Sequence, residues 1–396
     1  MFVRRLWLIG CTAAVLTGVF VGTGSAQAPD DSALRGLLTT TLNDFLTAQG
    51  PTEHISAASL RVTFGDGRPA IELPVGTTRY GSGQPIAADS LWQIGSNTKA
   101  FTAVMLLQLE AEHRLSINDR LGRWLPRYRQ WRHIRIRQLL DMTSGIPDYT
   151  SIPAFLRDYA ADPDREFAPS RLVRYAVGRP LKHGYYYSNT AYILAQMILE
   201  KVTRHSYAHE LRARIVRPLR LRSLFYRPDP YPARITDRLP AGYFFVSGTP
   251  HMAPLMGRDL RRKNLSYAAG AGGIVSSLED LSTWERALYA GRLLPPAQQR
   301  ELETLVSQKS GRPVTTLTAA DPEGYGLGVA QAFSPSLGSF WYYEGETFAF
   351  RVLHLYLPGP DVLVDLAVNS STKNRDDKLS ALGGLVIEVL QSEGAL

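Results

Sequence analysis

Four strand-like segments follow one another near the end of the chain, and only short turns containing Gly, Pro or Ser separate them. The segments are 325–333, 339–344, 349–357 and 362–369. Neighbouring parallel strands need a crossover of about a dozen residues or more, so this close spacing predicts an antiparallel meander. An apolar sheet face must be buried against another layer, so the rest of the chain has to supply helices or a second sheet.

Both ends of the chain carry patterns that could cover or extend this meander. Amphipathic spacing predicts helices over 31–48 and 376–391. Alternation of apolar and polar residues predicts strands at 58–64 and 70–75, joined by a turn at 65–67 that contains two glycines. Strands and one helix therefore come first in the chain, and the meander and a helix come last.

The middle of the chain, from 119 to about 265, has a helical pattern with many loops, prolines and arginines. The whole sequence therefore predicts an α+β domain over 35–392, with an antiparallel sheet flanked by helices and an inserted, mainly helical subdomain at about 119–265. A length of 396 residues is enough to bury a large core. The single cysteine, Cys11, excludes a disulfide framework and a metal site built from cysteines.

The first 28 residues have the layout of a secretory signal peptide. Arg4 and Arg5 precede an uncharged stretch over 6–22, and small residues over 24–28 follow it. We expect cleavage near Ala26 or Ala28, and hence a periplasmic or extracellular protein. An uncleaved anchor and lipidation at Cys11 are the alternatives. No later run approaches the roughly 20 apolar residues of a spanning helix, so we expect no stable membrane span after cleavage.

Ser96 and Lys99 lie one helical turn apart, at the start of a helix predicted over 100–109 that is apolar on almost every face. The N-terminus of such a helix favours developing negative charge. A lysine on an apolar helix loses hydration, which lowers its pKa and makes it a candidate base for the Ser96 hydroxyl. Ser370 and Lys373 repeat the spacing in a polar turn without a buried helix, so we interpret that copy as incidental.

Two further segments carry residues suited to acyl transfer. Tyr187 precedes a predicted helix, where a phenol could relay a proton, and Asn189 could hold a substrate carbonyl through its amide. In the segment 339–350, Gly345 would allow a ligand to approach the strand backbone. The backbone N–H groups of this segment, including that of Glu346, could supply half of an oxyanion hole.

Together these residues resemble the signatures of the serine β-lactamase and penicillin-binding-protein superfamily, specifically its class C β-lactamase-related branch. The three motifs, in chain order, are Ser96-x-x-Lys99, Tyr187-x-Asn189 and Tyr343-Glu344-Gly345. The resemblance covers roughly 35–392 and implies a β-lactamase/transpeptidase-like fold. It also implies a nucleophilic serine assisted by the lysine and the first tyrosine. The substrate-binding residues that it implies are Asn189, Tyr343, Gly345 and Glu346.

The third motif departs from the pattern of this superfamily. Tyr343 stands where the superfamily usually has a lysine or histidine, so the usual partner for a substrate carboxylate is replaced by a neutral phenol. Arg351, on the next predicted strand, is the candidate replacement for that charge. The resemblance therefore favours an esterase, an amidase or a D-amino-acid peptidase over an efficient β-lactamase.

We therefore expect an exported serine hydrolase that acts through a Ser96 acyl-enzyme on amide or ester substrates, of the D-Ala-D-Ala carboxypeptidase or esterase type. The expected partner is a small molecule or short peptide, with peptidoglycan fragments as one candidate. No cofactor and no metal are expected. The alternatives are a non-catalytic penicillin-recognising protein and a protein that binds envelope polymers.

Two other patterns bear on these alternatives. Residues 120–137 hold seven arginines and no acid, with Trp124, Tyr128 and Trp131 between them. This pattern could form a single-strand nucleic-acid platform, but we expect a solvated face or a contact with anionic polymers and no nucleic-acid partner. His205 and His209 have helical spacing but lack the glutamate of a metalloprotease motif, so we interpret them as a surface pair.

Overall fold

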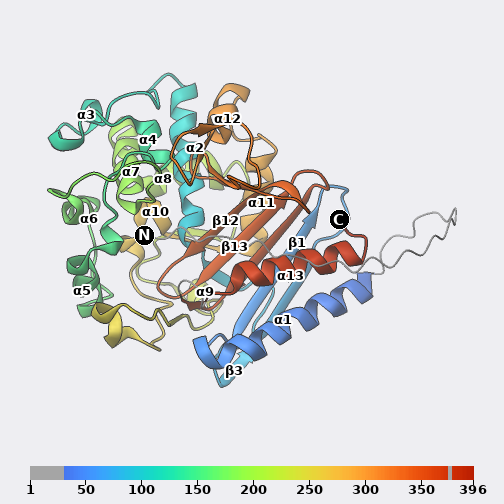
Figure 1. The fold of residues 1–396 in the computed structure, drawn as a ribbon. Helices are drawn as coiled ribbons and strands as arrows, with labels where there is room; N and C mark the ends of the chain where they lie inside the picture. The colour runs from blue at the N-terminus through green and yellow to red at the C-terminus, as the bar shows by residue number, and fades with distance from the viewer. Residues whose placement is uncertain (1–30, 373–376) are drawn as a thin grey trace.

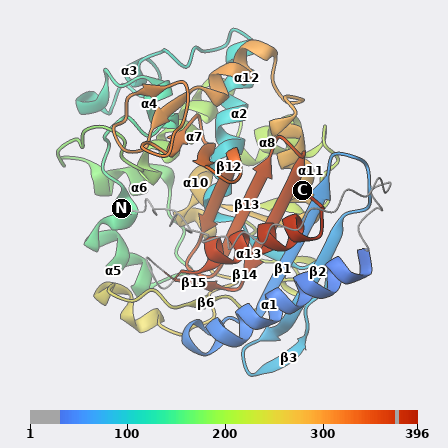
Figure 2. The ribbon, with the colours of Figure 1, turned by 45° about the vertical axis from the view of Figure 1, so that its right-hand side comes forward.

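The computed structural model describes residues 31–372 and 377–396. It contains one large antiparallel sheet, two helices on one face of that sheet, and a mainly helical part on the other (Figures 1 and 2). The α+β architecture predicted from the sequence is confirmed. The expected signal peptide over 1–28 lies outside the described residues.

The large sheet has ten strands in the order β3-β2-β1-β14-β13-β12-β11-β10-β8-β9. Its strands are β1 (Ala57–Phe64), β2 (Ile71–Arg79), β3 (Ser82–Pro85), β8 (Leu305–Ser307), β9 (Pro313–Val314), β10 (Glu323–Tyr325), β11 (Ala330–Ser334), β12 (Gly338–Glu346), β13 (Arg351–Leu357) and β14 (Val362–Val368). Two small sheets are formed by β4 (Leu91–Gln93), β7 (Ile274–Ser277) and β5 (Leu224–Tyr226), and by β15 (Ser370–Ser371) and β6 (Tyr243–Phe244).

The predicted meander is present as β10 to β14, and each of its strands pairs with the next in antiparallel register. The segment 325–333, predicted as one strand, is in fact divided between β10 and β11. Gly328 has a φ of +81°, a left-handed conformation that favours glycine and breaks the strand there. The predicted hairpin also joins this sheet, because β1 pairs with β14 as well as with β2.

The helices and helical turns complete the fold. The helices are α1 (Asp31–Glu53), α2 (Thr98–Ala111), α3 (Leu121–Trp124), α4 (Ile136–Leu140), α5 (Pro153–Ala161), α6 (Pro169–Ala176), α7 (Asn189–Thr203), α8 (Tyr207–Leu211), α9 (Ala233–Thr236), α10 (Ala269–Gly272), α11 (Leu278–Tyr289), α12 (Pro296–Glu303) and α13 (Leu379–Ser392). Turns of 3₁₀ helix are η1 (Gly95–Asn97), η2 (Arg129–Trp131), η3 (Tyr149–Ser151), η5 (Pro250–Leu255) and η6 (Leu265–Tyr267), and η4 (Arg212–Val216) is a π-helical turn.

Two apolar cores lie on opposite faces of the sheet. The smaller core joins α1 and α13, which run side by side in Figures 1 and 2, to the near face of β1, β13 and β14. The larger core lies on the opposite face and is centred on α2, whose residues from Thr98 to Leu107 are all buried. Helix α2 packs against α7, α10 and α12, so it connects the sheet to the helical part of the molecule. Among the residues that the structure describes, no helix is both long and apolar enough to cross a bilayer.

Candidate active site

Ser96 lies in the turn η1, between strand β4 and the buried helix α2. Gly95 has a φ of +50°, and a Cβ at this position would approach the backbone nitrogen of Glu346 to 2.5 Å. Only glycine therefore lets this turn and the end of β12 come together. Ser96 is half-buried, whereas Gly95 and Asn97 on either side of it are buried.

Lys99 is fully buried on the first turn of α2, and its Nζ atom has three oxygen neighbours. Ser96 Oγ, Asn189 Oδ1 and the Ala271 carbonyl oxygen each lie 2.8 Å from Nζ. Burial lowers the pKa of Lys99 to about 7, although the nearby Asp148 carboxylate opposes that shift. A neutral amine has two N–H groups and one lone pair. If the N–H groups donate to the amide and carbonyl oxygens, which only accept, the lone pair is left facing the Ser96 hydroxyl.

Tyr187 reaches Ser96 from the other side. Its hydroxyl donates to Ser96 Oγ at 2.7 Å, and Lys99 Nζ lies 4.8 Å from the centre of its ring. Loss of hydration raises the pKa of the Tyr187 phenol, so this side chain is neutral near pH 7. The phenol can therefore pass a proton on, whereas the amine of Lys99 is the stronger candidate for the base.

The position of Tyr187 follows from the start of α7. Ser188 caps this helix, because its Oγ accepts a hydrogen bond from the Ala191 backbone N–H at 3.3 Å. Asn189 is the first residue of the helix, and its Oδ1 accepts from Lys99. The predicted tyrosine and asparagine thus lie on either side of a capped helix start and meet the serine–lysine pair there.

The third motif lies at the end of β12 and meets the same turn. A Cβ at Gly345 would overlap the Ile94 carbonyl oxygen, so the strand passes this close only as glycine. Glu346 ends β12 beside Gly95, which places its backbone N–H next to the nucleophile's turn. Tyr343 is 5% exposed, and its hydroxyl donates to Tyr187 Oη at 3.4 Å. Tyr343 therefore contacts the partner of Ser96 instead of forming an open wall of the site.

Arg351 is not part of this site, and its predicted role in substrate binding is wrong. It is fully buried, and its guanidinium donates to Glu53 Oε2 and Asp377 Oδ1 at 2.6 Å each and to the Ser370 carbonyl oxygen at 2.9 Å. Strand alternation places it on the same face of β13 as Leu353, which packs in the core beneath α1 and α13. The side chain thus lies on the opposite face of the sheet from Tyr343.

The second serine–lysine copy and the histidine pair also lie away from Ser96 and its partners. Ser370 is in the short strand β15, not in an open turn, and its buried hydroxyl donates to the Glu53 carbonyl oxygen at 2.7 Å. Lys373 lies outside the described residues. His205 and His209 are both exposed, with ring centres 4.3 Å apart. The neighbouring Glu210 is held by Arg214 at 2.5 Å, so a metal ion there would face a cation.

Sequence reasoning missed Asp148, which organises one side of the site. Its carboxylate accepts hydrogen bonds from the Thr150 N–H and hydroxyl groups and from the Asn189 backbone N–H. The negative charge of Asp148 also raises the pKa of Lys99, against the lowering that burial causes. A single aspartate after a Gly-Ile-Pro turn has no spacing that relates it to Ser96, so no sequence pattern identifies it.

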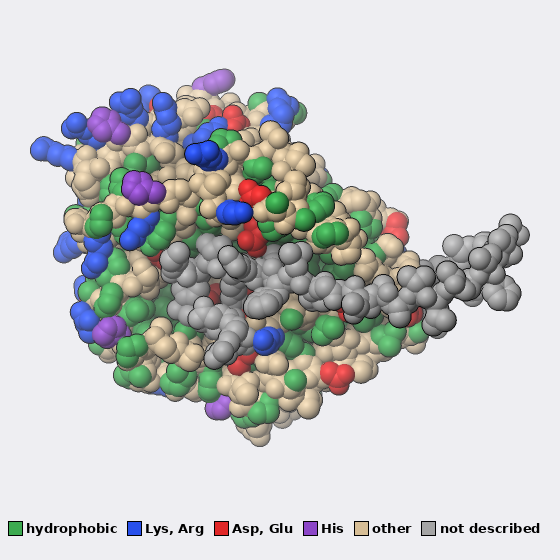
Figure 3. Space-filling model, viewed as in Figure 1, with side chains coloured by type: hydrophobic (Ala, Val, Ile, Leu, Met, Phe, Trp, Pro, Cys, Tyr) green, Lys and Arg blue, Asp and Glu red, His purple; other side chains and the backbone are tan. Residues whose placement is uncertain are grey.

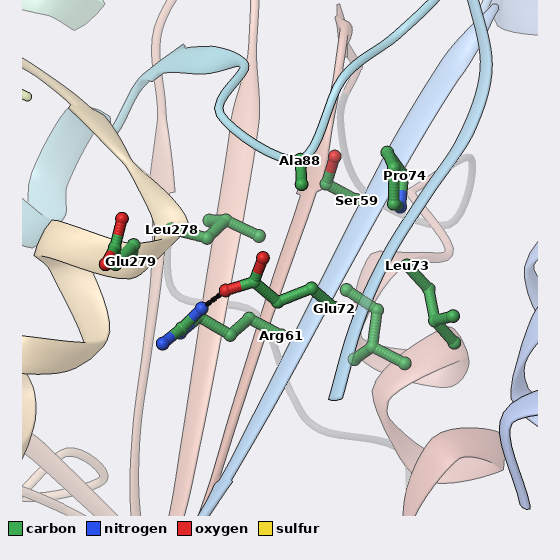
Figure 4. A pocket seen from close by; sticks show the side chains of 9 residues that line it. Ser59, Arg61, Glu72, Leu73, Pro74, Ala88, Leu278 and Glu279 are labelled. Atoms are coloured by element: carbon green, nitrogen blue, oxygen red, sulfur yellow. Dashed lines mark ion pairs between the residues drawn. The ribbon is translucent and has the colours of Figure 1, made fainter. Parts of the chain in front are cut away.

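Figure 4 shows a different hollow, lined by Arg61, Glu72 and neighbouring residues of β1, β2 and α11. Arg61 and Glu72 form an ion pair across it, and its volume is about 10 Å³. This is room for about one water molecule, and none of the residues around Ser96 lines it. The chemistry is therefore centred on Ser96, where a half-buried hydroxyl lies between an amine of lowered pKa and a neutral phenol. Such an arrangement can carry out nucleophilic acyl transfer.

Comparisons with known proteins identify the family of this chain. The family model described as Beta-lactamase matches residues 43–384. Penicillin-binding protein 4* of Bacillus subtilis (strain 168) is 27% identical over 274 residues, which cover 66% of this chain and 57% of that protein. The chain spans about half the length of the first curated relatives it matches, between 40% and 57%.

Two solved structures share the fold over nearly the whole chain. A D-stereospecific amidohydrolase from Streptomyces sp. is 28% identical with a TM-score of 0.71, and the match covers 91% of this chain and 98% of that one. A D-amino acid amidase from Ochrobactrum anthropi SV3, solved with D-phenylalanine, is 21% identical with a TM-score of 0.75. That match covers 92% of this chain and 100% of the amidase, and at this identity it shows the fold alone.

Proposed function

Because this chain belongs to the β-lactamase family, we propose that it is a serine hydrolase that forms an acyl-enzyme on Ser96. The observation that carries the proposal is the position of the Ser96 hydroxyl, 2.8 Å from Lys99 Nζ and 2.7 Å from Tyr187 Oη. A base and a proton relay on either side of one hydroxyl are the parts that nucleophilic catalysis requires.

In the first step, the neutral amine of Lys99 accepts the Ser96 proton while Ser96 Oγ bonds to the substrate carbonyl carbon. The lowered pKa of Lys99, about 7, keeps a large share of this amine neutral near pH 7. Asn189 and the Ala271 carbonyl hold the amine in place as it becomes an ammonium, because both oxygens accept its N–H groups.

The carbonyl oxygen takes up the negative charge that forms in this step. The backbone N–H groups of Ser96 and Glu346 are the proposed donors, because Gly95 brings the two backbone segments together. The bond to the leaving group then breaks, and the leaving group takes a proton through Tyr187. In a second round water gives a proton to the base and bonds to the acyl carbon, the bond from that carbon to Ser96 Oγ breaks, and Ser96 Oγ takes the proton as the acid is released.

We propose small amides or esters as substrates, with a preference for those that lack a carboxylate near β12. The buried phenol of Tyr343 carries no charge, and Arg351 is held on the other face of the sheet by Glu53 and Asp377. Two structural relatives are named as an amidohydrolase and an amidase for D-configured substrates, which favours D-amino-acid amides and peptides as the first compounds to test. D-Ala-D-Ala carboxypeptidase activity is the neighbouring possibility.

We also propose that the protein is exported. The support is the charged start at Arg4 and Arg5, the uncharged stretch over 6–22 and the small residues up to Ala28. N-terminal sequencing of the protein recovered from outside the cytoplasm tests this, with a new N-terminus near residue 27 or 29 as the expected result. A chain that still begins at Met1 would contradict cleavage.

The enzymatic proposal is tested with a fluorescent fluorophosphonate followed by peptide mapping. We expect a single adduct, on the peptide that contains Ser96. A panel of p-nitrophenyl esters, D-amino-acid amides, D-Ala-D-Ala peptides and nitrocefin then ranks the substrate classes. A folded protein that neither takes the label nor turns over any of these compounds would favour a non-catalytic binding protein instead.

A further inference from the structure

A cluster of exposed arginines lies on the helical part of the molecule, in the segment that contains α3, η2 and α4. Of the seven arginines over 120–137, Arg137 pairs with Glu301 and Arg123 pairs with Asp119. The other five are all exposed, and among the described residues none of them forms an ion pair with a carboxylate. We call these five the arginine face: Arg120, Arg127, Arg129, Arg132 and Arg135. In Figure 3, Lys and Arg side chains gather at the upper left, where Figure 1 places α3.

The backbone brings the two ends of this segment together. Arg120 and Arg135 are partners in an isolated antiparallel bridge, and the Gly122 N–H donates to the Arg132 carbonyl oxygen at 3.1 Å. The arginines are therefore concentrated on one small surface instead of being spread along an extended chain. Figures 1 and 2 both show α3 at the outer edge of the molecule, so this surface projects outward.

Two of the guanidinium groups in the face contact the same imidazole ring. The His133 ring lies between two guanidinium groups, with Arg132 Nε 2.9 Å from its Nε2 and Arg120 Nη1 3.5 Å from its Nδ1. The two guanidinium charges on either side of this ring repel each other, and a bound anion relieves that repulsion. Each guanidinium has five N–H donors, and its planar fork matches the oxygens of a phosphate group.

The aromatic residues of the segment do not form a stacking surface. Trp131 and Tyr128 are 1% and 6% exposed, and the Trp124 indole N–H donates to Asp119 at 3.1 Å. Single-stranded nucleic acids are bound largely by stacking bases on exposed aromatic rings, so this face does not suit that mode of binding. The face offers charge without a platform of exposed rings. Its segment lies at the outer edge of the molecule (Figures 1 and 2), where a planar layer of anions can reach it.

We propose that the arginine face docks this protein on bilayers that contain anionic phospholipids, with the lipid phosphates bound by the guanidinium groups. This contact is separate from hydrolysis at Ser96. Each basic residue near an anionic membrane contributes roughly a fivefold gain in affinity, so removal of three is expected to weaken binding on the order of 100-fold. The contact is electrostatic and should weaken steeply as salt is added.

The test uses flotation of the full chain with vesicles of phosphatidylcholine, either alone or with 30% phosphatidylglycerol. The apolar start of the chain can interact with both vesicle types, so the difference between them reports the charge-dependent contact. The test variant is Arg129→Gln/Arg132→Gln/Arg135→Gln. The matched control is Arg79→Gln/Arg262→Gln/Arg292→Gln, which removes the same charge from exposed positions elsewhere. Circular dichroism and fluorophosphonate labelling of Ser96 check that both variants remain folded.

We expect wild type and control to float with the anionic vesicles at low salt, and the arginine-face variant to lose this binding. Equal losses in the two variants would overturn the proposal, because the effect would then follow net charge alone. Binding to soluble polyphosphate without binding to anionic vesicles would also overturn it, in favour of a polymer partner.

Discussion

Asn97 and His354 are 257 positions apart in the sequence, and their side chains meet beneath the turn that carries Ser96. Asn97 Oδ1 lies 3.1 Å from His354 Nδ1, and Asn97 Nδ2 donates to the carbonyl oxygens of Ile94 and Val352 at 3.0 Å each. The residue next to the nucleophile is therefore held to strand β13 by two contacts, and to its own turn by a third. Movement of that strand would be transmitted to Ser96.

His354 in turn belongs to a buried group of titratable side chains. Its Nδ1 lies 2.7 Å from Glu285 Oε1, and its Nε2 lies 2.6 Å from the Tyr289 hydroxyl. Burial raises the pKa of Glu285 to about 8 and lowers that of His354 to about 4. Asp365, on the adjacent strand β14, has its pKa raised by burial as well. At neutral pH the group therefore retains carboxyl protons that the unfolded chain would release.

This retention predicts a pH dependence of stability. Between about pH 4.5 and 8, folded Glu285 holds a proton that the unfolded chain has lost, so its contribution to the free energy of unfolding falls as pH rises. Glu285→Gln removes this titration. We therefore expect the free energy of unfolding of this variant to fall less steeply than that of wild type between pH 5 and 8. Urea unfolding at several pH values measures it, with Glu279→Gln, an exposed position on the same helix, as the control. Identical pH slopes for the two variants would refute the argument.

Alanine substitutions of the serines in the two serine–lysine copies should have different effects. Ser96→Ala should abolish covalent labelling and turnover, because no other hydroxyl takes the position between Lys99 and Tyr187. Ser370→Ala should leave labelling intact but lower the free energy of unfolding by about 1 kcal/mol, since it removes the buried hydrogen bond to Glu53. Labelling and urea unfolding of both variants provide the comparison. Loss of labelling in the Ser370 variant would show that β15 affects the site.

Catalysis should depend on the charge state of Lys99. The neutral amine is the proposed base, so kcat/KM for a neutral ester should rise with pH and level off above an apparent pKa near 7. The Asp148 carboxylate favours the ammonium form, so Asp148→Asn should move this rise to lower pH. Thr150→Val removes a neighbouring hydroxyl without changing charge and serves as the control. If the apparent pKa of the kcat/KM profile is the same in Asp148→Asn as in wild type, another group is the base.

Much of this arrangement could be predicted from the sequence, for physical reasons. Ser96 and Lys99 are one turn apart on a helix, so their contact follows from local geometry. Arg351 was misplaced because the number of residues in the turn between β12 and β13 does not fix which face each residue takes. A shift of one residue moves a side chain to the other face of a sheet. Asp148 could not be found because its contact with Asn189 joins a loop to a helix start 41 positions away.

The neutral side chain of Tyr343, at the first position of the third motif, predicts a substrate preference. Neutral esters and amides should be turned over better than matched compounds with a carboxylate at that end. A missing charge-assisted bond is expected to cost about 1–2 kcal/mol, or roughly 5- to 30-fold in kcat/KM. Tyr343→Lys should narrow this gap, and Tyr343→Phe, which is also neutral, should leave it in place. A strong preference of wild type for carboxylate substrates would contradict the prediction.

Arg351 should matter for stability and not for substrate choice. Arg351→Met leaves the buried carboxylates of Glu53 and Asp377 without their cation, and we expect a loss of about 3–5 kcal/mol in the free energy of unfolding. Arg68→Met, which removes a partly exposed pair with Asp66, should cost less than about 1 kcal/mol. Urea unfolding compares the two variants. If Arg351→Met changed the preference between substrates with and without a carboxylate but left the free energy of unfolding unchanged, Arg351 would be a substrate-binding residue after all.

The pairing of β1 with β14 has a consequence for how the chain acquires its activity. About three quarters of the sequence separates these neighbours, and the Asn369 side chain accepts hydrogen bonds from the backbone N–H groups of Ser56 and Ala57, 313 and 312 positions away. The β1–β2 hairpin therefore keeps an open hydrogen-bonding edge until the ribosome has delivered the final strands. Contacts of such long range slow folding, and the open edge invites association with other chains in the interval. Because β14 and β13 connect β1 to β12, hydrolytic activity should arise late and all at once, after the last part of the polypeptide has been made.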